Sequence, residues 1–359
     1  ILSPNKVFGD YISNVLPELG EEPIYELGFA DIAKVQLERV IDFEGDKDPM
    51  EAQDAGWKER VRFKSSLDFV KRMDAFILEM PDMVFEPEDY AFGRFVEKAQ
   101  DIMARFLGYG KLPIKKRLEA MAEDMRAHFE TETYMGAELP KSRAILKALK
   151  SMLKVKSTLS LYKMFFKHIG CPKMFVMAAK KTLEWADVYP FLYLHTAYEG
   201  LMESRVIRHV VVDEMQDYTP IQYGVLKQLF PCQKTILGDF GQFINPNHQH
   251  TLEDILQLFD EAAFVEPTKS YRSTYALISF ARRIAPTVKI DAIERHGEMP
   301  RIVECPNVEA QMRTIQNRIK GFAKSPYSSL GIIAKTNELA KMLYDQLSRE
   351  QHVHFISPE

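Results

Sequence analysis

The chain has 359 residues, of which 46% are hydrophobic, and it carries a formal net charge of −4. This length and apolar content allow two or three domains with cores of their own, and no run of about 18 apolar residues marks a membrane-spanning helix. The slightly acidic net charge argues against a general nucleic-acid coat protein. The three cysteines include no CxxC pair, which argues against a zinc knuckle or a disulfide framework. This cysteine content is typical of a protein in a reducing cytoplasm.

The first section, residues 1–44, predicts the end of a strand, a loop, a helix and an acidic stretch. Ile1 and Leu2 precede Ser-Pro-Asn, which is typical of a strand that enters a loop. Apolar side chains then recur at helical spacing: Phe8, Tyr11, Ile12, Val15 and Leu16. The chain starts without a signal peptide, and both of its ends look like cuts through a longer protein.

Residues 45–194 predict an almost wholly helical region. One apolar stripe at helical spacing comprises Leu67, Val70, Met73 and Ile77, and the aromatic and Met residues from Tyr162 to Met177 are expected to pack in a core. Prolines are expected between the helices, at positions 81, 87, 113, 140 and 172. The middle of the chain is therefore interpreted as a helical subdomain.

The helical region contains a basic face. Residues 139–183 hold eleven Lys or Arg and no Asp or Glu. Four of the cations recur at helical spacing opposite the stripe of Ile145, Leu149 and Leu153, namely Arg143, Lys147, Lys150 and Lys154. Two interpretations stay open: a solvated helix face over a core, or a surface that tracks phosphates or docks a partner.

Two alternating sections follow the helical region. In residues 195–297, strands over 206–212 and 235–238 flank a helix over 221–230, which predicts a parallel, doubly wound sheet. In residues 298–359, strands are expected over 301–304, 330–334 and 353–356, with helices over 308–322 and 339–347 between them. The last section is interpreted as the beginning of a second α/β unit.

The strongest candidate for chemistry is the sequence VVVDEMQD, in which Asp213 and Glu214 follow an apolar strand. Strands of a parallel sheet end at one edge, where such folds bind their ligands. One acid there can hold Mg²⁺ together with nucleotide phosphates while the second polarises the attacking water. The alternative is a solvated acidic turn after an ordinary strand.

Two further polar groups follow in chain order. The next strand delivers Gly238, Asp239 and Gln242. The glycine lets the backbone approach a ligand and the glutamine amide can sense a terminal phosphate; the alternative is an ordinary turn after a strand, with Gly238 and Asp239 as turn formers. Arg272 precedes a helix and suits bidentate phosphate contact. His248 and His250 form an HxH pair without an evident third ligand, which favours loop residues over a metal site.

These segments resemble a known family. VDEMQD, GDFGQFI and SYRST resemble motifs II, III and IV of the UvrD/Rep-like superfamily 1 helicases, and the segment from Ser3 to Gly20 resembles their motif Ia region, most closely in the RNA-polymerase-associated HelD proteins. The resemblance implies an incomplete RecA-like P-loop NTPase domain from residues 1–44 and 195–297, a large all-helical insertion over 45–194, and the N-terminal part of a second RecA-like domain over 298–359.

The resemblance also implies ATP and Mg²⁺ as cofactors, and it implies roles for individual residues. Asp213 resembles the metal-holding acid, Glu214 the general base, Gln216 and Gln242 coupling residues near the nucleotide, and Arg272 a γ-phosphate contact. Gly238 and Asp239 would line the nucleotide, while Asn5 and Phe8 would contact nucleic acid or a partner. The chain contains no GxxxxGK[ST] phosphate-binding loop, so we expect no appreciable ATP hydrolysis by this chain alone.

Three hypotheses for function stay open. The first is a motor that acts on RNA polymerase, because the stretch from Asn245 to His248 has no Trp or Tyr on which a base could stack, and Phe243 before it is interpreted as a core residue. The second is a DNA-unwinding repair helicase, and the third is a non-catalytic interaction module of the same fold. The sequence sets no oligomeric state and predicts no membrane partner.

Overall fold

The chain forms two compact units. A computed structural model describes residues 1–3, 25–47, 54–131, 138–201, 204, 206–243, 245–259, 261–265, 269–270, 273–284, 291–292 and 295–356. The first unit comprises Ile1–Phe240 and Ile244–Phe259, and the second comprises Gly241–Phe243 and Asp260–Glu359. The expected helix with Phe8 lies outside the described residues. Within them, no helix has both the length and the apolar character that crossing a membrane requires.

A small parallel sheet lies in the first unit. Strand β6 (His209–Val212) pairs in parallel with β7 (Gln233–Ile236), and Leu2 forms parallel bridges to both Val212 and Leu27. The Leu2 amide donates to Val211 (2.8 Å) and the Leu2 carbonyl accepts from Asp213 (2.9 Å). The expected strand end at Ile1 and Leu2 is thus present, and it lies beside β6 on the side away from β7.

Helix α10 (Pro220–Leu229) connects β6 to β7. It begins one residue before the predicted start, because Pro220 occupies its first turn and Thr219 forms a capping box with Gln222. Helix α11 (Leu252–Leu258) packs against α10. The strand expected over 206–212 starts only at His209, which pairs with Gln233, the first residue of β7, and Val206 before it is 80% exposed.

Five helices of the first unit form a group that we call the helical body: α2 (Phe29–Leu37), α3 (Ala55–Lys64), α4 (Leu67–Val84), α8 (Thr158–His168) and α9 (Trp185–Tyr198). Leu67, Val70 and Met73 are buried as their spacing predicted. The expectation that Pro81 separates helices is wrong, because Pro81 lies inside α4. The burial of Met80 and Val84 on either side favours continuing the helix by one turn over ending it at the proline.

The helical region also contains strands, which corrects the expectation of an almost wholly helical middle. Strands β2 (Tyr90–Phe92) and β3 (Phe95–Glu97) form an antiparallel hairpin, whose turn uses Gly93 at φ 58°. Strand β5 (Thr182–Leu183) pairs with β4 (Met177–Ala179) and with β1 (Asp42–Phe43). These strands have two or three residues each, too few to produce a recognisable alternation in the sequence.

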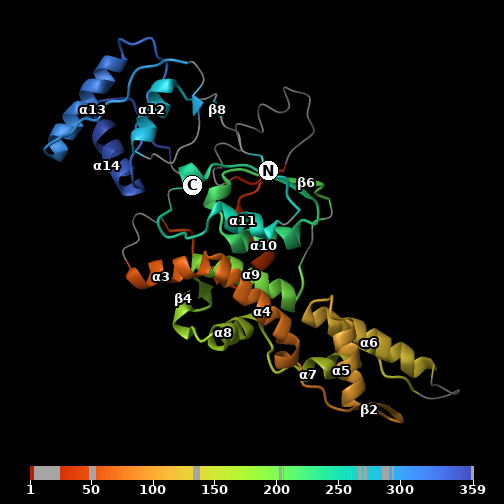
Figure 1. The fold of residues 1–359 in the computed structure, drawn as a ribbon. Coiled ribbons are helices and arrows are strands. Elements are labelled where there is room, and N and C mark those ends of the chain that lie inside the picture. Colours follow the sequence, from red (N-terminus) through yellow and green to blue (C-terminus); the bar gives the residue numbers. More distant parts are fainter. Residues whose placement is uncertain are drawn as a thin grey trace. The chain divides into compact units, whose positions relative to one another are not determined.

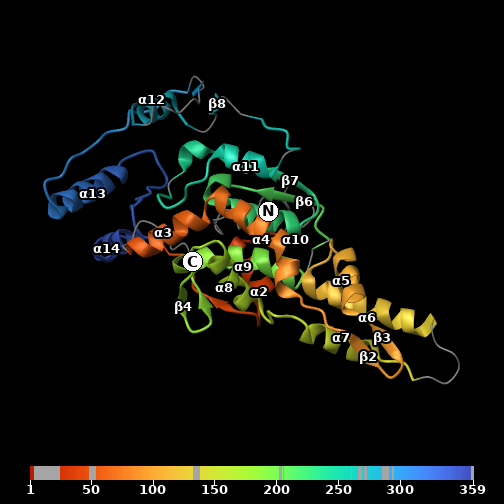
Figure 2. The ribbon, with the colours of Figure 1, turned by 60° about the horizontal axis from the view of Figure 1, so that its bottom comes forward.

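A lobe of the first unit consists of the β2–β3 hairpin and three helices: α5 (Ala99–Gly108), α6 (Ile114–Thr131) and α7 (Ser142–Ser151). These elements lie side by side at one end of the unit in both views (Figures 1 and 2). Helix α6 packs along α7, and Ile145 and Leu149 of α7 are fully buried. The stripe predicted for α7 therefore faces the core of this lobe.

The core of the helical body holds an ion pair. Tyr162, Phe165 and Phe166 are buried as expected, and they pack beside Lys64 and Asp187. The Lys64 ammonium lies 2.7 Å from Asp187 Oδ1, which also accepts a hydrogen bond from the Tyr162 hydroxyl (2.7 Å). This cluster joins α3, α8 and α9.

The second unit contains β8 (Lys269–Ser270) paired in parallel with β9 (Asp291–Ala292), and helices α12 (Tyr275–Ile284), α13 (Val308–Phe322) and α14 (Asn337–Leu347). The expected helices over 308–322 and 339–347 are confirmed. The strands expected over 301–304, 330–334 and 353–356 are not formed within the described residues, because their backbones find no partner strand there. Ile302, Ile333 and Ile356 remain 75%, 98% and 78% exposed.

Candidate functional site

Asp213 and Glu214 follow directly on β6, at the carboxyl end of the parallel strands. The Leu237 amide donates to Val212 (2.8 Å) and the Met215 amide donates to Leu237 (2.9 Å), so the chain beyond β7 clamps the turn that carries the two acids. Leu2 holds the other side of the same turn. Both carboxylates are partly exposed at this edge of the sheet.

Glu214 has a left-handed backbone, with φ 51° and ψ 52°. A non-glycine residue in this conformation carries about 1–3 kcal/mol of strain, which surrounding contacts must offset. Asp213 Oδ1 accepts from the Glu214 amide (3.0 Å), and the Glu214 carbonyl accepts from the Asp217 amide (3.0 Å). The strained turn therefore fixes the direction in which the Glu214 side chain leaves the sheet.

The Gln216 side chain connects this turn to the one after β7. Gln216 is only 2% exposed; its Nε2 donates to Glu214 Oε2 (2.7 Å) and its Oε1 accepts from the Asp239 amide (3.0 Å). These two bonds fix the orientation of the amide, because an exchange of its O and N would place a donor against the Asp239 N–H. One buried amide thus links the Glu214 carboxylate to the backbone of Asp239.

Gly238 makes this close approach possible. A Cβ at this position would lie 2.5 Å from Gln216 Oε1 and 2.6 Å from both the Cγ and the backbone N of Met215. Contacts this short with backbone require the two turns to move apart. Gly238 is therefore needed here for the packing of the two turns, and not for an unusual φ.

Buried aromatic hydroxyls and an acid lie behind the turn. Tyr223 of α10 donates to the Met215 carbonyl (2.9 Å). Burial raises the pKa of Asp217, and the nearby Glu214 carboxylate raises it further. Burial also raises the pKa of Tyr218 and Tyr223. The region behind Asp213 and Glu214 thus disfavours additional negative charge.

The loop after Asn245 packs close to the same turn. His250 is 4% exposed, and its ring lies edge-on to Phe240 and 5.6 Å from the ring of His248. Burial lowers the pKa of His248 and of His250 to about 4, so both rings are neutral near pH 7. Among the described residues no group of three or more His, Cys, Asp or Glu side chains is placed to hold a metal ion.

The structure brings together five of the predicted site residues: Asp213, Glu214, Gln216, Gly238 and Asp239. Gln242 belongs to the second unit, and Arg272, Asn5 and Phe8 lie outside the described residues. Asp213 and Glu214 offer the hard carboxylate oxygens that Mg²⁺ prefers. This arrangement could hold a hydrated cation with phosphate oxygens and orient a water molecule.

The predicted basic face is only partly helical. Arg143, Lys147 and Lys150 are exposed on α7. Lys154 was expected to continue their stripe, but α7 ends at Ser151 and Lys154 pairs with Glu86 (3.1 Å). The chain leaves the helix because Leu153 forms a β-bridge with Phe85.

Sequence reasoning missed the residues that support the site from behind. Tyr223 and Gln222 appeared only as members of a helix, and His250 appeared only as a loop residue. The signal for Gln222 was available, since Thr219 and Gln222 have the spacing of a capping box. No pattern in the sequence indicates the roles of Tyr223 and His250, which depend on contacts between separate segments.

Comparisons with known proteins support a distant helicase relationship. No known protein-family model matches the chain. The chain is 26% identical over 181 residues to proteins named ATP-dependent DNA helicase UvrD2 from Mycobacterium bovis and Mycobacterium tuberculosis. These alignments cover 44% of this chain and 26% of each relative, so the match spans about a quarter of the length of the relatives. The likeness supports a relationship to UvrD-like superfamily 1 helicases.

Proposed function

We propose that this chain is part of an ATP-dependent superfamily 1 helicase-like motor. In this proposal, residues 1–44 and 195–297 contribute to a RecA-like domain, residues 45–194 are inserted into it, and residues 298–359 begin a second such domain. The parallel order of Leu27, Leu2, β6 and β7 supports the first assignment, since Leu2 lies far from β6 in sequence and beside it in space. The likeness to UvrD2 supports the class.

The observation that carries the proposal is the link from Glu214 through Gln216 to Asp239. A solvated acidic turn would have no need for a strained backbone, a fully buried amide or a glycine without room for a Cβ. Strain of this kind is concentrated at functional sites, where it holds a side chain in a working position. The two turns are therefore expected to move as one element when nucleotide is bound or released.

In the proposed site, Asp213 would hold Mg²⁺ and Glu214 would accept a proton from the attacking water. The bound cation neutralises charge on the ATP phosphates. Gln216 holds the Glu214 carboxylate by donating to one of its oxygens, which leaves the second oxygen for water. Gln242 and Arg272 are proposed as contacts to the terminal phosphate, on the resemblance of their motifs.

For the partner, we propose bacterial RNA polymerase or a transcription complex, as in HelD-like proteins. The loop after Gln242 has no Trp or Tyr. Of its described residues, Asn247 is 1% exposed and the rings of Phe243 and His248 are partly buried, so these residues offer no fully exposed ring on which a base could stack. The likeness to UvrD2 equally supports the second candidate, a DNA-unwinding enzyme. A non-catalytic module of the same fold is the third.

ATP hydrolysis by the full-length protein separates these candidates. We expect hydrolysis that rises with added RNA polymerase and changes little with single-stranded DNA, and retention of the polymerase by the immobilised protein. Stimulation by single-stranded DNA alone would select the DNA-unwinding enzyme, and no hydrolysis under any condition would select the non-catalytic module. The isolated 359-residue chain should not hydrolyse ATP; turnover by this chain that disappears in Glu214→Gln would overturn that expectation.

A further inference from the structure

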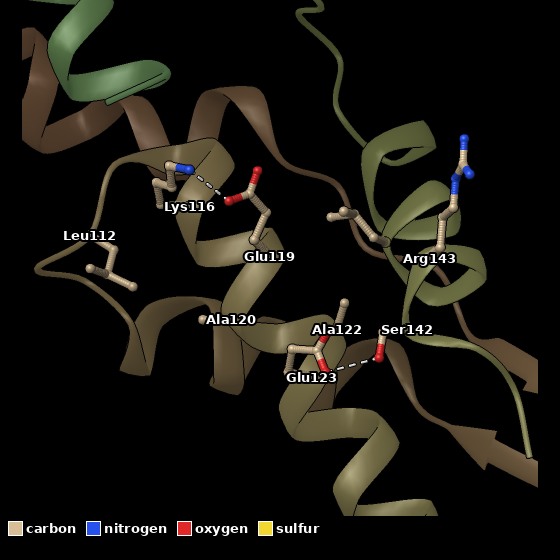
Figure 3. Close-up of a pocket in the computed structure, with 9 residues that line it drawn as sticks. Leu112, Lys116, Glu119, Ala120, Ala122, Glu123, Ser142 and Arg143 are labelled. Atoms are coloured by element: carbon tan, nitrogen blue, oxygen red, sulfur yellow. Dashed lines mark hydrogen bonds and ion pairs between the residues drawn. The ribbon is translucent and has the colours of Figure 1, made fainter. Parts of the chain in front are cut away.

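A groove runs between α6 and α7 in the lobe of the first unit (Figure 3). Its volume is about 590 Å³, and its apolar lining comes from Leu112, Ala120, Ala122 and Leu146. The lining is completed by polar side chains at the two rims: Lys116, Glu119, Glu123, Ser142 and Arg143. We call this feature the α6–α7 groove.

The two rims of the groove differ in charge. On the α6 rim the carboxylates are already occupied, since Lys116 pairs with Glu119 (2.8 Å) and the Ser142 hydroxyl donates to Glu123 (2.9 Å). On the α7 rim, Arg143 points away from α6 (Figure 3). Across the described residues, neither Arg143 nor Lys147 nor Lys150 forms an ion pair or a side-chain hydrogen bond.

The cations and the apolar lining belong to adjacent strips of α7. Arg143, Lys147 and Lys150 recur at intervals of four and three residues, so they share one exposed face, and Leu146 lies beside that face. Ile145 and Leu149 occupy the opposite face and are fully buried. A molecule in the groove would thus meet an apolar floor with Arg143 at its α7 rim. A molecule that extended over this rim would also meet Lys147 and Lys150, which lie on the adjoining exposed face of α7.

We propose that the α6–α7 groove binds an amphipathic helix with an acidic face, supplied by a protein partner. The apolar stripe of such a helix would cover Leu112, Ala120 and Leu146, and its carboxylates would pair with the cations of α7. Helix α7 has ten residues, so about three turns of a partner helix match its length. This inference does not depend on the motor assignment, because it uses residues far from Asp213 and Glu214 in the sequence.

Nucleic acid fits the same groove less well. A phosphate backbone gains nothing from an apolar floor and would approach the carboxylates of Glu119 and Glu123. Single strands are bound by stacking on aromatic side chains, and none of the residues that line the groove is aromatic. The charge pattern alone would suit either class of partner, and the apolar floor favours the helix.

Fluorescence anisotropy with the 359-residue chain tests the proposal. The probe is a fluorescein-labelled peptide of about 14 Leu and Glu residues, with Leu spaced three and four apart to give one apolar face. Its controls are a peptide of scrambled order and a labelled single-stranded DNA. The variants are Lys147→Glu/Lys150→Glu, Leu112→Ser, and the matched charge reversal Lys163→Glu/Lys167→Glu on the exposed face of α8.

We expect the amphipathic peptide to bind with a Kd below about 200 µM and about tenfold more tightly than the scrambled peptide. Reversal at Lys147 and Lys150 should weaken binding about five- to tenfold, Leu112→Ser should weaken it about threefold, and the α8 variant should change it less than about twofold. Circular dichroism checks that each variant is folded.

Three results would overturn the proposal. The first is no binding, or equal binding of both peptides, which would show that the floor of the groove contributes nothing. The second is equal weakening by the α7 and α8 reversals, which would indicate general charge attraction. The third is binding of the DNA that depends on Lys147 and Lys150 and not on Leu112, which would assign the α7 face to phosphates.

Discussion

Lys64→Met tests the buried cluster that joins α3, α8 and α9. Lys64 is 2% exposed and Asp187 is not exposed at all, and Asp187 Oδ1 lies 2.7 Å from both the Lys64 ammonium and the Tyr162 hydroxyl. Burial raises the pKa of Asp187, and the Lys64 charge opposes that rise. Methionine keeps much of the volume of lysine and removes the charge, so the variant leaves a carboxylate in the core without a counter-ion.

The structure sets the size of the effect. With its counter-ion gone, Asp187 is expected to take up a proton in the folded state. The ordinary pKa of this carboxyl is 3.8. Keeping Asp187 protonated at pH 7 therefore costs up to about 4 kcal/mol of folding free energy, at 1.36 kcal/mol per pH unit. At pH 5 the same cost falls to about 2 kcal/mol, because the pH is then closer to the pKa that Asp187 has in the unfolded chain. We therefore expect Lys64→Met to lower the free energy of unfolding by about 3–4 kcal/mol at pH 7 and by about half as much at pH 5.

Tryptophan fluorescence during urea denaturation measures this directly. The two tryptophans of the chain, Trp57 in α3 and Trp185 in α9, both belong to the first unit, so their signal reports that unit. The control is Lys64→Met/Asp187→Leu/Tyr162→Phe, which removes all three polar groups and should recover most of the loss. A loss below about 1 kcal/mol in Lys64→Met, or a loss that does not change with pH, would refute the reasoning.

Further predictions concern the site. Gly238→Ala should lower the free energy of unfolding by about 1–3 kcal/mol, because its Cβ meets backbone and the Gln216 amide; urea denaturation showing no change would contradict the close packing of the two turns. Gln216→Leu removes both hydrogen bonds of a buried amide and should destabilise the first unit by about 1–3 kcal/mol in the same assay, whereas an effect below about 0.5 kcal/mol would show that the link is dispensable. His248 and His250 stay neutral in the folded chain with pKa values of about 4, while the unfolded chain binds their protons near the ordinary value of 6.5. Stability should therefore fall on acidification from pH 6.5 to pH 4, by on the order of 2–3 kcal/mol per ring. His248→Gln should flatten that dependence relative to the unsubstituted chain, and parallel curves would exclude His248 as a contributor.

Periodicity predicted the long elements of this chain well. Helices α4, α7, α10, α13 and α14 all follow apolar stripes or caps that are visible in the sequence. Short strands were not predicted, because two or three residues give no alternation, and the β2–β3 hairpin depends on pairing between Tyr90 and Glu97. In the second unit, three strands were predicted and are not formed in the described residues. An apolar run such as the one around Ile333 gives the sequence pattern of a strand, but it forms one only where a neighbouring strand accepts its hydrogen bonds.

The acids of the site could be predicted, and the network that holds them could not. Asp213 and Glu214 follow a short apolar run, which is a local signal. The hydrogen bonds of Gln216 to Glu214 and Asp239 depend on how two turns separated by α10 meet at the sheet edge. The left-handed backbone of Glu214 could not be predicted from the sequence either, because glutamate rarely adopts this conformation.

The most direct test of the proposed motor is Glu214→Gln in the full-length protein. Glutamine keeps the size of the side chain and cannot accept the proton from water, so ATP should still bind with Mg²⁺ while its hydrolysis falls by about 10²–10⁴-fold. Glu253→Gln, on the exposed first turn of α11, is the matched control and should leave hydrolysis unchanged. Hydrolysis by Glu214→Gln at the rate of the unsubstituted protein would contradict the assignment of this turn as the catalytic centre.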